Sequence, residues 1–149
     1  NLMEKFKAKG VVPVLLDGDE IRHAIRQTGY DRDSRRKHNL NVGFIASLFE
    51  KQGNIVIVAL ISPYDDVRNE IRSMCAKFIE VYVSTDLQVC IDRDAKGLYK
   101  RAIAGELENF TGISDSYFPP SQPEVVVETA TMSIKECTVK ILDFYRKQK

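Results

Sequence analysis

The chain has 149 residues, a formal net charge of +1 and 44% hydrophobic residues. This length and composition predict one globular domain with a single core. The near-zero net charge gives no global basic field for binding nucleic acid. No apolar run approaches the roughly 18 residues that a membrane span needs, and no signal-peptide pattern opens the sequence. We therefore expect a cytoplasmic protein without nucleic-acid or membrane partners.

The cysteine and histidine content argues against a structural metal site. The three cysteines, Cys75, Cys90 and Cys137, are scattered and fit no metal-binding spacing. With only two histidines in the chain, a zinc site is not expected. Reduced thiols within apolar patterns are the preferred interpretation, which again favours a cytoplasmic setting.

The elements predicted in chain order alternate between helix and strand. Leu2, Met3 and Phe6 fall at helical spacing before a helix stop at Lys9 and Gly10. Four segments rich in Val or Ile then predict strands, and the second is apolar without alternation, as in a strand buried on both faces of a parallel sheet. The predicted strands are 11–16, 54–61, 78–84 and 124–128, and the helices between and after them are 42–51, 67–75 and 133–147. This alternation predicts an α/β fold with a parallel sheet.

Two carboxylates follow the first predicted strand, in Asp17-Gly18-Asp19. Ligands of open parallel sheets bind at the carboxyl ends of the strands. Carboxylates there can hold a Mg²⁺ ion and orient or deprotonate an acceptor hydroxyl. The alternative is a turn with Asp19 as a helix N-cap, which the bare pattern taken alone favours.

Basic residues and a hydroxyl follow in the next two segments. Arg22 shares a predicted helix face with Asp19. The run 32–38 is mostly basic, and a solvated helix face is the preferred interpretation for most of it, although one or two arginines could clamp a phosphate or sulfate. Ile61-Ser62-Pro63-Tyr64 ends the second predicted strand and places a hydroxyl at the same edge of the sheet.

The segment 93–113 combines basic residues, glycines and aromatics. Arg93, Lys96, Lys100 and Arg101 suit a flexible cationic lid of the kind that phosphoryl transfer uses to exclude water and stabilise charge. A solvated basic helix is an equal alternative. Phe110 and Tyr30 could each stack on a base, although simple packing is the default for either one alone.

Together these segments resemble the adenylylsulfate kinase (APS kinase) family of the P-loop kinase superfamily. The segment "RDAKGLYKRA" with the following "FTGI" is the most family-specific part of the resemblance. The similarity extends over most of the chain and is carried by LDGDEIRH (16–23), the basic segment 30–43, ISPY (61–64), the segment 78–117 and PEVVVET (123–129).

This resemblance implies a reaction and its cofactors. The family transfers the γ-phosphoryl group of ATP to the ribose 3′-hydroxyl of adenylylsulfate, giving the sulfate donor PAPS. It implies a P-loop NTPase-like three-layer sandwich, ATP as co-substrate, Mg²⁺ as cofactor, a homodimer, and possible fusion to or association with ATP sulfurylase.

The resemblance also implies roles for individual residues. Asp19 is similar to the carboxylate that serves Mg²⁺ and the acceptor hydroxyl, and Arg93 would lie by the ATP adenine. Lys96 would belong to the lid and serve both nucleotides. Tyr30 and Phe110 match the aromatics that sandwich the acceptor adenine. The full set implied for binding the acceptor is Asp17, Arg22, Tyr30, Arg35, His38, Asn39, Ile61, Ser62, Lys96 and Phe110.

One departure from the family concerns the basic segment. The family pattern runs Asp-Arg-x-x-Asn-(Ile/Val)-Arg-Arg, whereas this chain has Ser34, His38, Leu40 and Asn41 in place of the Asp, the Asn and the two final arginines. His38 could still donate a hydrogen bond, or Asn39 could substitute for it after a small shift. The affinity for the acceptor, or its identity, is therefore an open question.

A second departure is that no G-x-x-x-x-G-K-[ST] occurs in the sequence. That loop cradles the ATP phosphates, and the strand before it would be central in the sheet. We therefore expect residues upstream of Asn1, so that 1–149 is an N-terminally incomplete APS kinase-like domain. A chain complete as given would have neither a stable fold nor kinase activity, because unpaired strands leave unmet buried hydrogen bonds.

Three hypotheses follow. The first is an APS kinase, alone or within a bifunctional sulfate-activating enzyme. The second is a non-catalytic nucleotide-binding remnant of the family. The third is a related small-molecule kinase with another acceptor, which the changes at His38, Leu40 and Asn41 motivate.

Overall fold

A computed structural model of the chain describes residues 2–148. Within it the chain divides into two compact units, an N-terminal unit, Leu2–Phe78, and a C-terminal unit that begins at Ile79. The assignment of 1–149 to one domain stays a prediction. None of the helices in the described part of the chain combines the length and apolar character needed to cross a bilayer.

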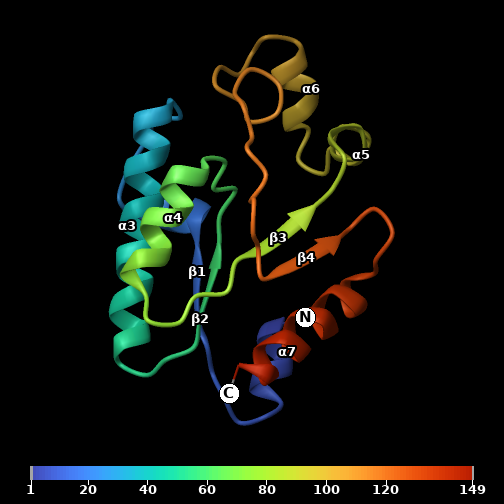
Figure 1. Cartoon of the computed structure of the whole chain (residues 1–149). Coiled ribbons are helices and arrows are strands. Elements are labelled where there is room, and N and C mark those ends of the chain that lie inside the picture. Colours follow the sequence, from blue (N-terminus) through green and yellow to red (C-terminus); the bar gives the residue numbers. More distant parts are fainter. Residues whose placement is uncertain (1, 149) are drawn as a thin grey trace. The chain divides into compact units, whose positions relative to one another are not determined.

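The elements alternate between helix and strand in both units (Figure 1). The N-terminal unit contains α1 (Leu2–Lys7), β1 (Val14–Asp17), α2 (Gly18–Ala24), α3 (Arg32–Lys51), β2 (Val56–Ala59) and α4 (Asp65–Met74). The C-terminal unit contains β3 (Val81–Ser84), α5 (Leu87–Arg93), α6 (Leu98–Ile103), β4 (Val125–Glu128) and α7 (Ile134–Lys147).

Every strand pairing is parallel, which confirms the predicted α/β fold class. In the N-terminal unit β1 pairs with β2, with Leu16 opposite Val58. In the C-terminal unit β3 pairs with β4, with Val83 opposite Val127. The described strands therefore form two separate two-stranded sheets. The three-layer arrangement of the predicted sandwich involves both units and stays a prediction.

The helices differ from the prediction mainly where the sequence is polar. α3 begins at Arg32, ten residues before the predicted start at position 42. Asp31 caps it, because the Asp31 carboxylate accepts hydrogen bonds from the backbone N–H and the hydroxyl of Ser34 at 3.0 and 2.7 Å. The segment predicted as a flexible lid, 93–113, contains the short helix α6, and α5 ends at its first residue, Arg93. At α3 the cap at Asp31 sets the start of the helix where apolar periodicity is weak.

The core of the N-terminal unit lies between the sheet and two helices. Figure 1 shows α3 alongside β1 and β2, and α4 packs against α3. Leu16, Val42 and Ala46 form one buried cluster, and Leu60 packs against it. A second cluster joins the turn after β2 to α4 and contains Tyr64, Val67 and Ile71, with Leu40 and Phe78 packed against it.

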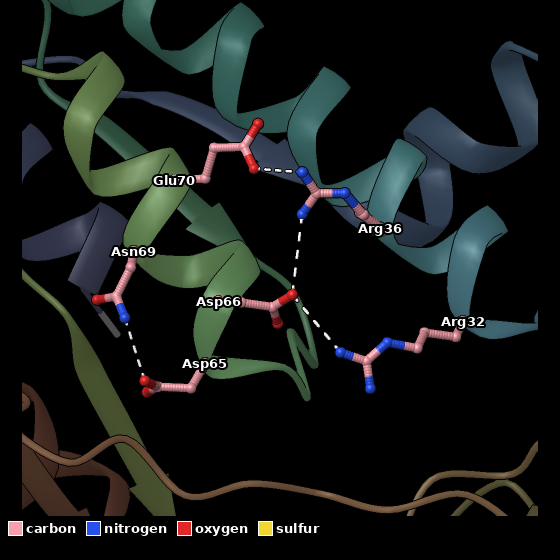
Figure 2. Close-up of polar contacts among 6 residues, drawn as sticks. All are labelled: Arg32, Arg36, Asp65, Asp66, Asn69 and Glu70. Carbon is pink, nitrogen blue, oxygen red and sulfur yellow. Dashed lines mark hydrogen bonds and ion pairs between the residues drawn. The ribbon is translucent and has the colours of Figure 1, made fainter.

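A polar network joins α3 to α4 at the edge of this core (Figure 2). Arg36 pairs with Glu70 and, at 4.0 Å, with Asp66. Arg32 pairs with the same Asp66 carboxylate at 3.5 Å and stacks over the buried Tyr64 ring at 4.6 Å. These ion pairs are half-exposed, so each is worth little singly, and their role is to set the alignment of the two helices.

The C-terminal unit buries β4 against α7 (Figure 1). Val125 and Val127 are 4% and 2% exposed, and Leu142 on α7 is 5% exposed. The predicted capping box at the start of α7 is confirmed, because Ser133 and Glu136 each accept the other's backbone N–H. Cap and apolar stripe thus agree on where this helix begins.

Replacing Gly43 with alanine tests the packing of α3 on α4. A Cβ at this position would lie 2.8 Å from Cγ1 and Cγ2 of Ile71. Alanine in a helix interior normally stabilises by roughly 0.5–1 kcal/mol relative to glycine, but overpacking costs about 1–3 kcal/mol. We expect Gly43→Ala to lower the free energy of unfolding measured with urea.

The exposed Asn41 on the same helix provides the control. Asn41→Ala improves helix propensity without a clash, so it should leave stability equal or slightly higher. A Gly43→Ala variant as stable as Asn41→Ala would contradict the close approach of the two helices.

Candidate functional site at the carboxyl ends of β1 and β2

The carboxyl end of β1 leads directly into α2. Asp17 is the last residue of β1, and its Oδ1 accepts hydrogen bonds from the backbone N–H of Asp19 at 2.8 Å and of Glu20 at 3.3 Å. Asp17 is therefore the N-cap of α2, and the alternative that Asp19 is the cap is wrong. The Asp19 side chain is thereby kept out of the cap, in the exposed first turn of α2.

Gly18 brings the start of α2 against the end of β2. It is buried, and a Cβ at this position would overlap the Leu60 side chain and lie 3.2 Å from the Ala59 carbonyl oxygen. Only glycine permits this approach. The spacing of Asp17 and Asp19 thus places both carboxylates at the edge where β1 and β2 end.

Two buried arginines hold the loop between α2 and α3. Arg22 Nη1 donates to the Gly29 carbonyl at 2.6 Å, and Arg35 Nε donates to the Tyr30 carbonyl at 2.7 Å. Both guanidinium groups also lie over the Tyr30 ring, at 4.7 and 5.7 Å from its centroid. Each arginine is 8% exposed, whereas Tyr30 is 52% exposed. The arginines are therefore fixed, and part of the Tyr30 ring faces solvent.

Burial separates the residues of the basic run. Arg32 and Lys37 are exposed and Arg36 is half-buried, as a solvated helix face predicts, but Arg35, His38 and Asn39 are buried. Burial also lowers the pKa of the Arg22 guanidinium. A buried guanidinium stays charged in proteins and attracts anions strongly. Arg22 and Arg35 are thus the two buried arginines whose guanidinium groups lie over the Tyr30 ring.

His38 lies among these residues with its hydrogen-bonding capacity unused. It is 2% exposed, and neither ring nitrogen has a hydrogen-bond partner among residues 2–148. Burial lowers the pKa of His38, and Arg22 lowers it further, while the Gly18 backbone and Asp19 oppose the shift. The imidazole is therefore neutral at pH 7, with one donor and one acceptor nitrogen.

Leu40, Asn41 and Ser34, which also depart from the family pattern, have other roles or are exposed. Leu40 packs against the cluster of Tyr64, Val67 and Ile71, and Asn41 is exposed. Ser34 bonds to the helix cap Asp31. Of Ser34, His38, Leu40 and Asn41, His38 is the one that is buried, and it lies near Arg22.

The turn after β2 contributes Ser62, held in an unusual conformation. Its φ of +44° is in the left-handed region, which costs a non-glycine residue about 1–3 kcal/mol. Asn39 Nδ2 donates to Ser62 Oγ at 3.3 Å, so α3 and this turn meet at the predicted site. Ile61, before it, is 63% exposed.

Arg68 is a residue that the sequence interpretation missed. It is 7% exposed, and its Nη1 donates to the Ser62 carbonyl at 2.8 Å. Residue type does not distinguish it from Arg72 one turn later, which stacks over Phe78. Its spacing of three from Asp65, with which it pairs, was the one available signal.

The C-terminal unit places Arg93 at the ends of β3 and β4. Its Nη1 donates to Thr129 Oγ1 at 3.1 Å, and its Nη2 donates to the Thr129 carbonyl at 2.7 Å. The hydroxyls of Thr85 and Thr129 share a hydrogen bond. Both threonines directly follow predicted strands, a signal that could have identified them. They form a polar edge at the carboxyl ends of this second sheet.

The predicted lid residues lie in and around α6. Lys96 is exposed, between α5 and α6. Phe110 is half-buried and contacts Tyr99 edge-on, with ring centroids 5.2 Å apart at 75°. The Phe110 carbonyl accepts hydrogen bonds from the N–H groups of 113, 114 and 115, which makes a tight turn of the "NFTGI" segment. The lid tip is thus locally ordered.

The residues present fit a Mg²⁺ ion delivered with a nucleotide. Among residues 2–148 no three His, Cys, Asp or Glu side chains gather as a ready metal site. Mg²⁺ is commonly bound by one or two carboxylates together with substrate phosphates and water. The exposed Asp19 at the strand end meets that requirement.

Comparisons with known proteins agree on one family. A family model described as Adenylylsulphate kinase matches residues 1–128. An adenylyl-sulfate kinase from Synechococcus sp. (strain JA-3-3Ab) is 42% identical over 144 residues, covering 96% of this chain and 82% of that protein. A probable bifunctional SAT/APS kinase 2 from Sorangium cellulosum (strain So ce56) is 41% identical over 142 residues, covering 95% of this chain and 24% of that protein.

A solved structure is similar over nearly the whole chain. It is the Mycobacterium tuberculosis APS kinase CysC in complex with AMPPNP and APS, with a TM-score of 0.93 and 33% identity. The match covers 97% of this chain and 86% of that one.

The buried state of His38 predicts a pH effect on stability. The folded pKa is lowered, so the unfolded chain binds more protons at acidic pH. The contribution of neutral His38 is present above the unfolded pKa of about 6.5 and is lost as pH falls through the lower folded pKa. We expect the free energy of unfolding to decline over that window and the decline to shrink in His38→Asn.

Nuclear magnetic resonance of the histidine rings tests this directly. The His38 signal should titrate at lower pH in the folded protein than in a urea-denatured sample, and His38→Asn assigns it against His23. A His38 titration midpoint in the folded protein at or above that in the denatured protein would contradict the lowered pKa of the buried imidazole.

Proposed function

This chain belongs to the adenylylsulphate kinase family, and we propose that it transfers the γ-phosphoryl group of ATP to the 3′-hydroxyl of adenylylsulfate, giving PAPS. Such a phosphotransferase serves sulfate activation. The observation that carries the proposal is the pair of buried guanidinium groups, Arg22 and Arg35, fixed beside the partly exposed ring of Tyr30.

This arrangement suits an acceptor with an anionic group next to a base. Planar guanidinium groups bind phosphate and sulfate oxygens through paired hydrogen bonds. The exposed face of Tyr30 offers a stacking surface for the adenine. We assign Arg22 and Arg35 to the phosphosulfate group and Tyr30 to the base. Ile61 and Ser62 would line the same site from the turn after β2. Asn39 and His38 would line it from α3.

Asp19 is the proposed catalytic carboxylate. It lies in the first turn of α2, where Asp17 supplies the helix cap and leaves Asp19 to serve the reaction. Its carboxylate would orient the acceptor hydroxyl and accept its proton, and it would also hold Mg²⁺. Bound there, Mg²⁺ neutralises charge on the transferred phosphoryl group.

The C-terminal unit supplies the proposed ATP and lid residues. Arg93, fixed by two hydrogen bonds to Thr129, offers a flat guanidinium surface for the ATP adenine. Lys96 provides an exposed cation for phosphate oxygens of either nucleotide. Phe110, held edge-on by Tyr99, would stack on the acceptor adenine from the lid.

A related kinase with a different nucleotide acceptor is the second candidate. The buried neutral His38, in place of the family asparagine, favours it. Imidazole is wider than an amide and presents its donor and acceptor at a different angle. Turnover of adenylylsulfate against other nucleotides carrying a 5′-anionic group would separate the two candidates.

We further propose a cytoplasmic homodimer. Three free cysteines in the described residues suit a reducing compartment. The bifunctional relative from Sorangium cellulosum supports fusion to, or association with, ATP sulfurylase as a further possibility for this chain. Light scattering of the full-length protein would measure the oligomeric state.

Asp19→Asn tests the catalytic assignment. Loss of the base and of the Mg²⁺ charge partner should reduce kcat for adenylylsulfate phosphorylation by about 100-fold or more, measured as PAPS formed by the full-length protein. Glu20→Gln is the matched control, because Glu20 is exposed in the same helical turn. Equal kcat values for the two variants would contradict a catalytic role for Asp19.

Tyr30→Ala tests the base-stacking assignment. Base–aromatic stacking is worth roughly 1–3 kcal/mol, so the KM for adenylylsulfate should rise about 5- to 150-fold while the KM for ATP stays unchanged. Tyr30→Phe keeps the ring and should retain most of the affinity. A parallel rise in both KM values would indicate that the loop, rather than the ring, had been disturbed.

A further inference from the structure

We propose that Arg68 is a positioning residue, which holds the Ser62 hydroxyl at the edge of the acceptor site without touching the acceptor itself. This proposal rests on the phosphotransfer function proposed above.

The first observation is the backbone of Ser62. Its φ of +44° is a conformation that glycine adopts freely and serine does not. Glycine would make the same turn at lower cost, but it would lose the hydroxyl. A strained serine at a strand end, where ligands bind in parallel sheets, indicates that the hydroxyl has a use.

The second observation is the hold of Arg68 on this turn. Its Nη1 donates to the Ser62 carbonyl at 2.8 Å, and its Nη2 donates to Asp65 Oδ1 at 2.8 Å. Asn69 Nδ2 donates to the other oxygen of the same carboxylate at 3.1 Å (Figure 2). Tyr64, the N-cap of α4, makes no side-chain capping hydrogen bond. One buried guanidinium therefore ties the strained turn to the first turn of α4.

The third observation is the state of the hydroxyl. Asn39 Nδ2 donates to Ser62 Oγ at 3.3 Å, and this is the hydrogen bond of that hydroxyl among residues 2–148. It uses an acceptor lone pair of Oγ and leaves the O–H proton available. Ser62 can therefore donate to an anionic oxygen, the same ligand chemistry that Arg22 and Arg35 serve.

Arg68 acts on this donor indirectly, through the backbone of Ser62. It is 7% exposed, and its guanidinium donates to the Ser62 carbonyl and to Asp65 at the start of its own helix. If Arg68 fixes Ser62, its removal should affect acceptor binding through Ser62. If Arg68 only stabilises α4, its removal should lower stability and leave acceptor binding by the folded molecules unchanged.

Steady-state kinetics of the full-length protein separate these roles. We expect Arg68→Met to raise the KM for adenylylsulfate about tenfold with the KM for ATP unchanged, and Arg68→Lys to restore part of the loss. In a Ser62→Ala background, Arg68→Met should add little further. Arg146→Met, at an exposed arginine of α7, is the control. An unchanged KM for adenylylsulfate, or equal effects with and without the Ser62 hydroxyl, would overturn the proposal.

Urea unfolding tests, without any substrate, whether Arg68 holds the strained backbone of Ser62. Ser62→Gly should raise the unfolding midpoint of the wild type, because glycine relieves the strained φ, and Ser62→Ala should not. In Arg68→Lys, where the hydrogen bond to the Ser62 carbonyl is weakened, Ser62→Gly should raise the unfolding midpoint by less. An equal rise in both backgrounds would contradict the hold of Arg68 on the Ser62 turn. A wild type that does not phosphorylate adenylylsulfate would instead contradict the proposed function and leave this measurement valid.

Discussion

Burial of two guanidinium charges is the constraint on which the N-terminal site depends. Removing a cation from water costs several kcal/mol unless hydrogen bonds and charge compensate it. Arg22 and Arg35 are both 8% exposed, and the carbonyls of Gly29 and Tyr30 accept their hydrogen bonds. The carbonyls satisfy donors of both guanidinium groups, and the Asp19 carboxylate lies near enough to Arg22 to favour its charge. These two fixed cations beside Tyr30 are the feature on which the proposed binding of an anion depends.

The loop between α2 and α3 and the cap of α3 follow from this constraint. Gly29 fits tightly, since a Cβ there would lie 2.8 Å from Ser34 Cβ and 3.0 Å from Asp31 Oδ2. Asp31 starts the helix that carries Arg35, His38 and Asn39. The ion pairs of Arg32 and Arg36 with α4 then fix that helix beside the turn that carries Ser62. One helix thus aligns the anion site with the end of β2.

The sequence predicted the parallel α/β class and the four strands, because β-branched runs and alternating elements are strong signals. It did not predict that α3 starts at Arg32, because the first ten residues of that helix are polar apart from Leu40 and its start depends on the cap at Asp31. Residue types and family resemblance named Arg22, Tyr30 and Asn39, and the structure places Arg22 over the Tyr30 ring and Asn39 against Ser62. The role of Arg68 could not be predicted from the sequence, because it depends on a backbone carbonyl that only the folded turn presents.

The departures from the family pattern now have different physical meanings. Leu40 completes an apolar cluster and Asn41 is exposed, so neither changes the chemistry beside the arginine pair. His38 does, because an imidazole stands there in place of the family asparagine, and neither ring nitrogen has a hydrogen-bond partner among residues 2–148. We therefore propose that, of these substitutions, the one at His38 bears on the choice of acceptor.

Identification of the product made by the full-length protein from ATP, Mg²⁺ and adenylylsulfate tests the central claim most directly. The account predicts adenylylsulfate carrying one additional phosphate on the ribose 3′-hydroxyl, identified by mass spectrometry and ³¹P nuclear magnetic resonance. Absence of this product, while another 5′-anionic nucleotide is phosphorylated under the same conditions, would contradict it.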